Sequence, residues 1–186
     1  MSATKALNGF RPSRKRGGAS NSTAQNVYDI ASGYAANIFS GDPVVLVAGK
    51  VNVMTGDTDR ILGVFAGCEY EANGVPTFSA YWPSGTSATN AKAYVLDDPS
   101  QLYVVQADAS ITAGDIGELN FGVTLGAGST VTKRSGFGVK AATRATTSLA
   151  VRAISLVDEP GNTITSAYPK VEARFIQMLD AFISAA

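Results

Sequence analysis

The sequence predicts an all-β fold, either an antiparallel β-sandwich or a β-barrel, with an extended N-terminal arm. Three observations predict it. From residue 27 onward, short apolar and β-branched runs alternate with Gly, Asp-Pro and Asn-Gly breakers, at spacings typical of sandwiches and barrels. The first 26 residues lack this periodicity. The first sixteen carry five basic residues and no acidic one.

Length and composition predict one body with an appendage. The chain has 186 residues, of which 45% are hydrophobic and 16% charged, enough apolar material for a core under a surface with little charge. We therefore divide it into an extended basic arm, residues 1–26, and an all-β body, residues 27–186. The whole chain balances fifteen basic with fifteen acidic residues, so the body without the arm's five cations carries a net charge of −5. Such a split predicts a protein that lies on a partner.

The body's strands are expected where apolar runs stand between breakers. They are residues 44–47, 50–54, 61–70, 77–81, 93–96, 102–105, 149–157 and 171–176. Asn73-Gly74 predicts a tight hairpin turn with positive φ. Pro76 then belongs at a strand start or on an edge strand, because proline has no N–H for a ladder.

Two further segments have weaker patterns. Residues 122–148 are rich in Gly, Thr, Ser and Ala, and we interpret them as an irregular strand pair with a surface loop. The same stretch holds the basic residues Lys133, Arg134 and Lys140. At the C-terminus, residues 177–186 could form one or two helical turns with Leu179 on the apolar face.

The arm has few apolar residues to bury. We expect it to be disordered when free and extended when bound, because little burial offsets the entropy of ordering it. Its basic residues are Lys5, Arg11, Arg14, Lys15 and Arg16. Leu7 and Phe10 are its large apolar side chains, and we expect them to occupy grooves of a partner. On charge alone, that partner could equally be a nucleic acid or an acidic protein.

The composition disfavours catalysis and cofactor binding. The chain has no histidine, so the commonest general base and metal ligand is missing. Its one cysteine, Cys68, ends an apolar run and is expected to be a buried, inert thiol. Glu69 and Glu71 share one face of a strand and are expected to be solvated rather than an acid–base pair. Asp57-Thr58-Asp59 lacks the glycine and distal glutamate of a calcium loop, so a turn is expected.

The chain has no run of about 18 apolar residues that could span a membrane. The absence of a signal-peptide pattern and of cysteine pairs predicts folding in a reducing cytosol.

Tyr81-Trp82 has two interpretations. A buried corner of the body is the simpler one, and an interface anchor is the functional one.

Seven stretches spread along the chain resemble the head decoration, or cement, proteins of tailed bacteriophages. They are residues 3–14 (ATKALNGFRPSR), 30–46 (IASGYAANIFSGDPVVL), 61–70 (ILGVFAGCEY), 81–83 (YWP), 93–99 (AYVLDDP), 115–117 (DIG) and 154–160 (ISLVDEP). The resemblance implies a small β protein on the outer surface of a capsid. It further implies a homotrimer that bridges neighbouring major capsid protein subunits, with no catalytic residues, cofactor or nucleic-acid partner.

The leading hypothesis is therefore a structural protein of the virion, made in the host cytoplasm, whose arm binds protein. The alternative is a tail or fibre component that recognises a host surface, for which exposed aromatics and Gly/Thr-rich loops would suit glycan contact. An enzyme such as a small glycosidase is the least favoured hypothesis.

Overall fold

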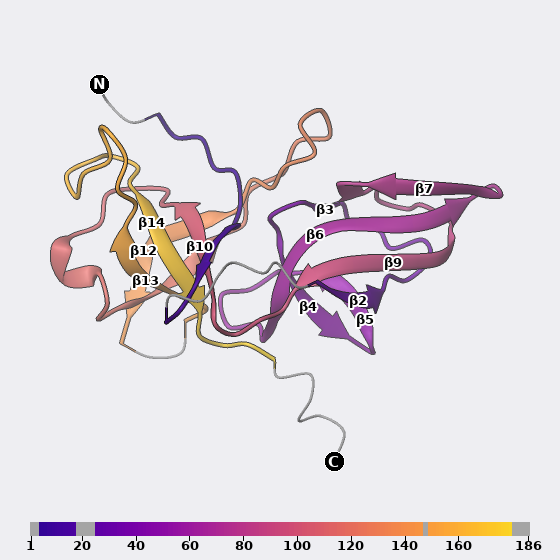
Figure 1. Cartoon of the computed structure of the whole chain (residues 1–186), viewed down its shortest axis with the longest axis horizontal. Coiled ribbons are helices and arrows are strands. Elements are labelled where there is room, and N and C mark those ends of the chain that lie inside the picture. The colour runs from indigo at the N-terminus through magenta and orange to yellow at the C-terminus, as the bar shows by residue number, and fades with distance from the viewer. Residues whose placement is uncertain (1–3, 18–24, 147–148, 180–186) are drawn as a thin grey trace, which may run out of the picture.

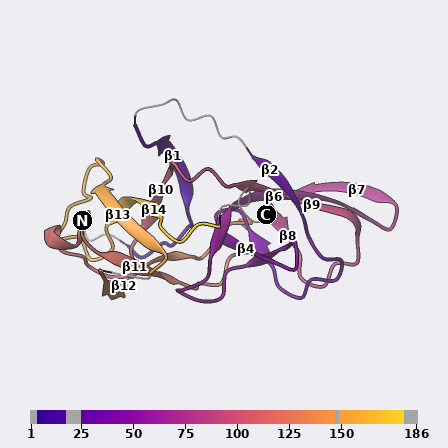
Figure 2. The ribbon, with the colours of Figure 1, turned by 90° about the horizontal axis from the view of Figure 1, so that it is seen from below.

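The structure, a computed structural model, describes residues 4–17, 25–146 and 149–179. It confirms the all-β prediction. The described residues contain no helix apart from a three-residue 3-10 turn, η1 (Ala113–Asp115). Two β lobes lie side by side (Figure 1), and a view from below shows the same arrangement (Figure 2).

One lobe is a closed five-stranded barrel with one further strand. Its strands, in order, are β4 (Pro43–Val47), β5 (Lys50–Val53), β2 (Asn26–Asp29), β9 (Thr89–Leu96), β6 (Ile61–Ala72) and β7 (Val75–Ser79), and β4 also pairs with β6. The length of β6 makes closure possible, because its first part pairs with β4 and its second part with β7. At Gly63 a Cβ would lie 2.3 Å from the carbonyl oxygen of Leu96, so glycine permits the close approach of β6 and β9.

The other lobe, which we call the arm sheet, has six antiparallel strands. In order they are β1 (Arg11–Lys15), β10 (Gln101–Gln106), β14 (Lys170–Phe175), β13 (Val151–Leu156), β11 (Asn120–Thr124) and β12 (Gly138–Ala145). Ala107, directly after β10, forms a bridge with Val139 of β12. The sheet therefore curls toward a second barrel. A small ladder of β3 (Ile38–Phe39) and β8 (Tyr81–Trp82) completes the fold.

Each lobe has an apolar core, and the two cores are joined. The barrel core includes Trp82, Phe65 and Val95, all 0% exposed. The core of the arm sheet also takes in residues on the barrel side of the junction, namely Met54, Ile61, Val64 and Leu96. Because these side chains bury apolar area between the lobes, the two lobes pack as one body.

Most of the expected local structure is confirmed. Asn73 (φ 53°) and Gly74 (φ 76°) form the hairpin turn between β6 and β7. Pro76 lies on β7, the outer strand of the barrel lobe. The irregular strand pair expected in residues 122–148 is β11 and β12, which are joined by the loop of residues 125–137.

The helical turns expected at the C-terminus are wrong for the residues described there. Gln177 lies in a bend, Met178 forms a bridge with Ile61, and the N–H of Leu179 donates to the carbonyl oxygen of Ile61 over 2.7 Å. Leu179 packs on the barrel core. Pairing with the start of β6 thus outweighs the weak helical pattern. Residues 180–186 lie outside the described residues.

The arm is the main correction to the sequence analysis. Its described residues, 4–17, lie on the chain's own body (Figure 1), and β1 pairs antiparallel with β10. Phe10 is 1% exposed and packs against Phe175 (ring centroids 4.8 Å apart) and Tyr103 (6.3 Å). The expectation that Phe10 occupies a partner's groove is therefore wrong for this structure. Its side chain is a core residue of its own chain.

Backbone and amide hydrogen bonds hold the segment that precedes Phe10. The side chain of Gln106 accepts from the N–H of Ala6 (2.7 Å) and donates to the carbonyl oxygens of Thr4 and Tyr168 (both 3.1 Å). The N–H of Gly9 donates to the carbonyl oxygen of Phe137 over 3.1 Å. Residues 4–9 belong to no strand, and these bonds satisfy hydrogen-bonding groups of their backbone. The bonds offset part of the entropy that is lost when this segment becomes ordered.

We predict that Phe10→Ala lowers the free energy of unfolding by about 3–5 kcal/mol, because it leaves a cavity in the core of the arm sheet. Urea or thermal unfolding measures this. The matched control is Phe78→Ala, which deletes the same side-chain atoms at a position that is 75% exposed to solvent. This variant should change the free energy of unfolding by less than about 0.5 kcal/mol. Equal losses in both variants would contradict the placement of Phe10.

Candidate partner-binding site

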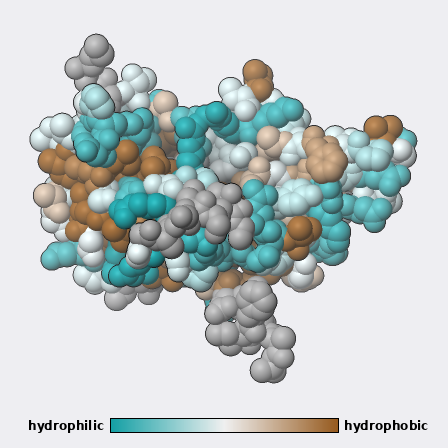
Figure 3. All heavy atoms as spheres, viewed as in Figure 1, coloured by the Kyte–Doolittle hydropathy of each residue, from teal (hydrophilic) through white to brown (hydrophobic). Residues whose placement is uncertain are grey.

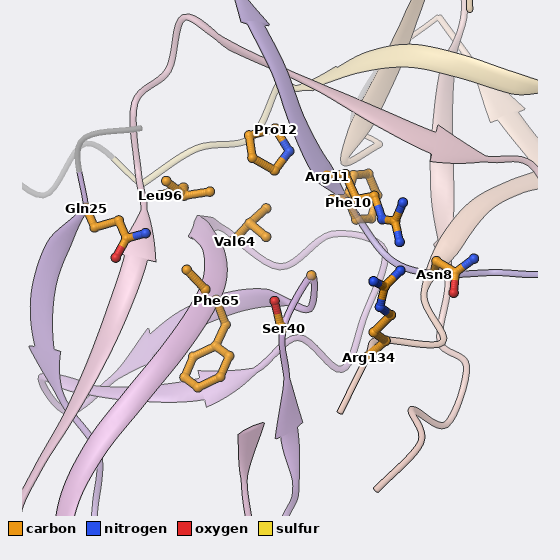
Figure 4. A pocket seen from close by; sticks show the side chains of 12 residues that line it. Asn8, Phe10, Arg11, Pro12, Gln25, Ser40, Val64, Phe65, Leu96 and Arg134 are labelled. Carbon is orange, nitrogen blue, oxygen red and sulfur yellow. The ribbon is translucent and has the colours of Figure 1, made fainter. Parts of the chain in front are cut away.

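An open pocket lies where the arm meets the barrel and the loop of residues 125–137 (Figure 4), with a volume of about 320 Å³. Apolar side chains from the arm, β6 and the end of β9 form part of its wall, namely Phe10, Pro12, Val64, Phe65, Ala66 and Leu96. Polar residues supply the rest, namely Asn8, Arg11, Gln25, Ser40 and Arg134. An apolar wall with a few polar groups is typical of a binding site.

A tight backbone crossing positions the pocket. Gly9 has φ 72°, and a Cβ on it would lie 2.3 Å from the Cβ of Ser135 and 2.6 Å from the carbonyl oxygen of Gly41. The N–H of Ser135 donates to the carbonyl oxygen of Ser40 over 3.0 Å, and the N–H of Phe10 donates to that of Gly41 over 2.9 Å. Only glycine suits both the backbone angle and the space at position 9. This crossing brings Arg134 of the loop to the arm.

The pocket carries positive charge. Arg11 and Arg134 both line it and are exposed. Neither forms an ion pair with any of the described residues. Asp42 lies next to Gly41 in sequence but is 1% exposed, and burial raises its pKa to about 6. The pocket therefore presents two solvent-facing guanidinium groups beside an apolar wall.

Two of the arm's cations are bound within the chain. Arg14 forms an ion pair with Glu172 (2.7 Å), and Lys15 forms one with Asp98 (2.7 Å). Lys5 and Arg16 are exposed and have no ion pair among the described residues. The cations predicted to bind a partner thus divide into two that hold the arm and three that face solvent, Lys5, Arg11 and Arg16.

The other predicted site residues lie apart from one another. Leu7 is half-buried against β12, where a Cβ on Gly138 would lie 2.6 Å from a methyl carbon of Leu7. Trp82 is 0% exposed in the barrel core, so its interpretation as a buried corner is confirmed and the interface anchor is wrong. Tyr81 is half-buried and stacks on Phe39 with centroids 5.5 Å apart, and the Lys133 ammonium lies 5.9 Å from its ring centroid.

Sequence reasoning missed the role of Arg134 and of residues 25 and 40 in this pocket. The only signal was the basic content of the loop, since Lys133 and Arg134 follow one another. Lys140, the third basic residue noted there, forms an ion pair with Asp57 over 3.3 Å. The bridge between Ser40 and Arg134 joins segments far apart in sequence, so no local pattern could indicate it.

The structure agrees with several of the expected turns and with the buried thiol. Asp59 accepts from the N–H groups of Thr55 and Gly56, both over 2.9 Å, which is a turn. Cys68 is 2% exposed, and burial raises its pKa to about 12, so the reactive thiolate is strongly disfavoured.

Within residues 4–17, 25–146 and 149–179, no group of three His, Cys, Asp or Glu residues could hold a metal ion. In those same ranges no helix has the length and apolar character to cross a membrane.

Comparison with protein-family models, with curated proteins and with solved structures finds no match. The resemblance to phage decoration proteins therefore depends on the seven stretches quoted above.

The arm's ion pair predicts a pH dependence of stability. Hydrogen bonding from Arg14, with help from Ser13 and Ser155, lowers the pKa of Glu172 from 4.5 to about 2. Because the folded pKa is the lower one, this stabilisation is fully present above about pH 4.5 and is lost as the pH falls toward 2. We expect Glu172→Gln to lower the melting temperature at pH 7, by an amount that shrinks as the pH falls from 5 to 2. Circular dichroism melts across this range measure it.

The control for this prediction is Glu118→Gln, because Glu118 is exposed and forms no ion pair among the described residues. It removes one negative charge without touching the arm. A loss in Glu172→Gln that stays constant from pH 7 to pH 2 would show that the carboxylate does not hold the arm.

Proposed function

We propose that the chain is a structural decoration, or cement, protein that binds the outer surface of a phage head and bridges neighbouring major capsid protein subunits. The observation that carries this proposal is the pocket that Arg11 and Arg134 line. An ordered arm places Arg11 beside Arg134 over an apolar wall, on a chain whose body has a net charge of −5. The resemblance of seven stretches to phage decoration proteins supports the choice of a major capsid protein as the partner.

The mechanism is bridging without catalysis. An acidic segment of one shell subunit would occupy the pocket, where both guanidinium groups can hold its carboxylates. The remaining faces of the molecule would contact a second subunit, so that opening the shell breaks these contacts as well. The homotrimer that the resemblance implies would multiply the contacts and slow release from the shell. In this proposal the protein is made in the host cytoplasm and resides on the virion.

A pre-ordered arm favours tight binding. Residues 11–15 already pair with β10, and Phe10 is already buried. Binding through Arg11 therefore does not carry the full entropic cost of ordering the arm, as a disordered arm would. Point substitutions on the arm's surface therefore test its role better than a deletion of residues 1–16, which would also remove the core side chain of Phe10 and strand β1.

We predict that the double variant Arg11→Glu/Arg134→Glu stays folded and loses about tenfold or more in affinity for purified, expanded, undecorated heads. Both side chains are exposed, so charge reversal leaves the core intact while it repels an acidic segment. Sedimentation of heads with bound protein measures the occupancy at several protein concentrations.

The matched control is Lys133→Glu, since Lys133 neighbours Arg134 in sequence and does not line the pocket. It should change occupancy by no more than about twofold, a free-energy change of about 0.4 kcal/mol. Unchanged occupancy in the folded double variant would contradict the pocket's role in shell binding.

One observation favours the alternative, a tail or fibre component that recognises a host surface. Val75 and Phe78 on β7 are 60% and 75% exposed, and β7 lies on the far side of the barrel from the arm sheet (Figure 1). The space-filling view shows hydrophobic residues at the surface of this end of the molecule (Figure 3). An exposed aromatic of this kind suits the apolar face of a sugar. Copy number decides between the two functions, because quantitative electrophoresis of virions should give hundreds of copies for a decoration protein and few for a tail protein.

A further inference from the structure

Three arginines lie on the arm sheet apart from the pocket. The register of β13 and β14 places Arg152 directly opposite Arg174. Arg16 follows β1, and its backbone N–H donates to the carbonyl oxygen of Ser100 over 2.8 Å, just before β10. Figure 1 shows β14 between β10 and β13. We call Arg16, Arg174 and Arg152 the arginine row.

The row has unfavourable electrostatics within the chain itself. Like charges directly opposite each other on neighbouring strands destabilise a sheet. The Nε of Arg152 donates to the amide oxygen of Asn120 over 2.8 Å, and this acceptor is uncharged. The Nε of Arg174 is buried without a hydrogen-bond partner among the described residues. Burial lowers the pKa of Arg174, and the charges of Arg16 and Arg152 lower it further.

The carboxylate on the same face of β14 cannot neutralise the row. Glu172 lies two residues before Arg174 and therefore on the same face of β14. Its two oxygens already accept bonds from Arg14 (2.7 to 3.2 Å), from the hydroxyl of Ser13 (2.7 Å) and from that of Ser155 (3.0 Å). The sequence of residues 18–24, which directly follows Arg16, contains no Asp or Glu. None of the three arginines forms an ion pair with a described residue, so the row has no bound counter-charge in the part of the chain that the structure describes.

We propose that the arginine row binds the carboxylates of an acidic segment from another protein. Guanidinium groups hold carboxylates in a bidentate manner. Arg152 and Arg174 are paired on neighbouring strands, whose backbones lie roughly 5 Å apart. Arg16 adds a third guanidinium group from the arm. A short acidic segment fits better than a nucleic acid, because the body's net charge of −5 repels a long polyanion but costs little with a few carboxylates. None of the three arginines lines the basic pocket, so this site is independent of the proposed function.

The test uses the full chain with Arg11→Glu/Arg134→Glu as the parent protein, so that the basic pocket does not also bind the probe. It measures binding of a fluorescently labelled oligoglutamate peptide to this parent at low and at physiological ionic strength. Arg174→Met keeps the apolar stem of the side chain and removes its charge. We expect about tenfold weaker peptide binding in this variant. We also expect a higher melting temperature of the free protein, because a repulsion is removed. Lys133→Met, which removes one positive charge from the loop of residues 125–137, should change peptide affinity by less than about twofold.

Arg16→Met provides a second variant in case Arg174→Met does not fold, because Arg16 is exposed, and it should weaken binding in the same direction. Two results would overturn the proposal: peptide affinity that is equal in the parent protein and the arginine variants, or a parent protein that does not bind the peptide. Tighter binding of a single-stranded oligonucleotide of matched charge, lost in the same variants, would overturn it in favour of a nucleic-acid site.

Discussion

The packing of Phe10 at the junction of arm, arm sheet and barrel is the interaction on which the rest of the structure depends. Its ring contacts Tyr103 and Phe175 inside the arm sheet, while its backbone N–H donates to Gly41 on the barrel side. Burying a phenylalanine contributes about 1.5–3 kcal/mol, which is large for a segment with so few other apolar groups. The glycine at position 9 lets the chain cross Ser135 just before this side chain is buried.

Once the arm is held there, its charges acquire separate roles. Arg14 and Lys15 pair with Glu172 and Asp98 of the body, and these bonds keep β1 on β10. Arg11 then faces solvent at the pocket, and Arg16 reaches the arginine row. A run of cations that looks uniform in sequence is thus divided by strand geometry into charges that stabilise the fold and charges that can bind a partner.

Most strands were predictable because their apolar and β-branched runs are local signals, as is the Asn73-Gly74 turn. The arm was not, because β1 has no apolar alternation and its ordering comes from distant contacts, among them that of Phe10 with β10 and β14. The pocket was missed for a related reason, since Ser40 and Arg134 meet only through tertiary structure. Arg174 lies in the strand expected at residues 171–176, but its pairing with Arg152 depends on register that no local pattern reveals.

The most direct test of this account is native-state hydrogen exchange of the free protein, resolved at Gly9 and Phe10. Their N–H groups donate to Phe137 and Gly41, so an arm that belongs to the fold should protect them to about the same degree as the amide of Val105 in β10. Exchange at the rate of an unstructured peptide, with Val105 still protected, would show that the arm leaves the body in solution and would contradict the account.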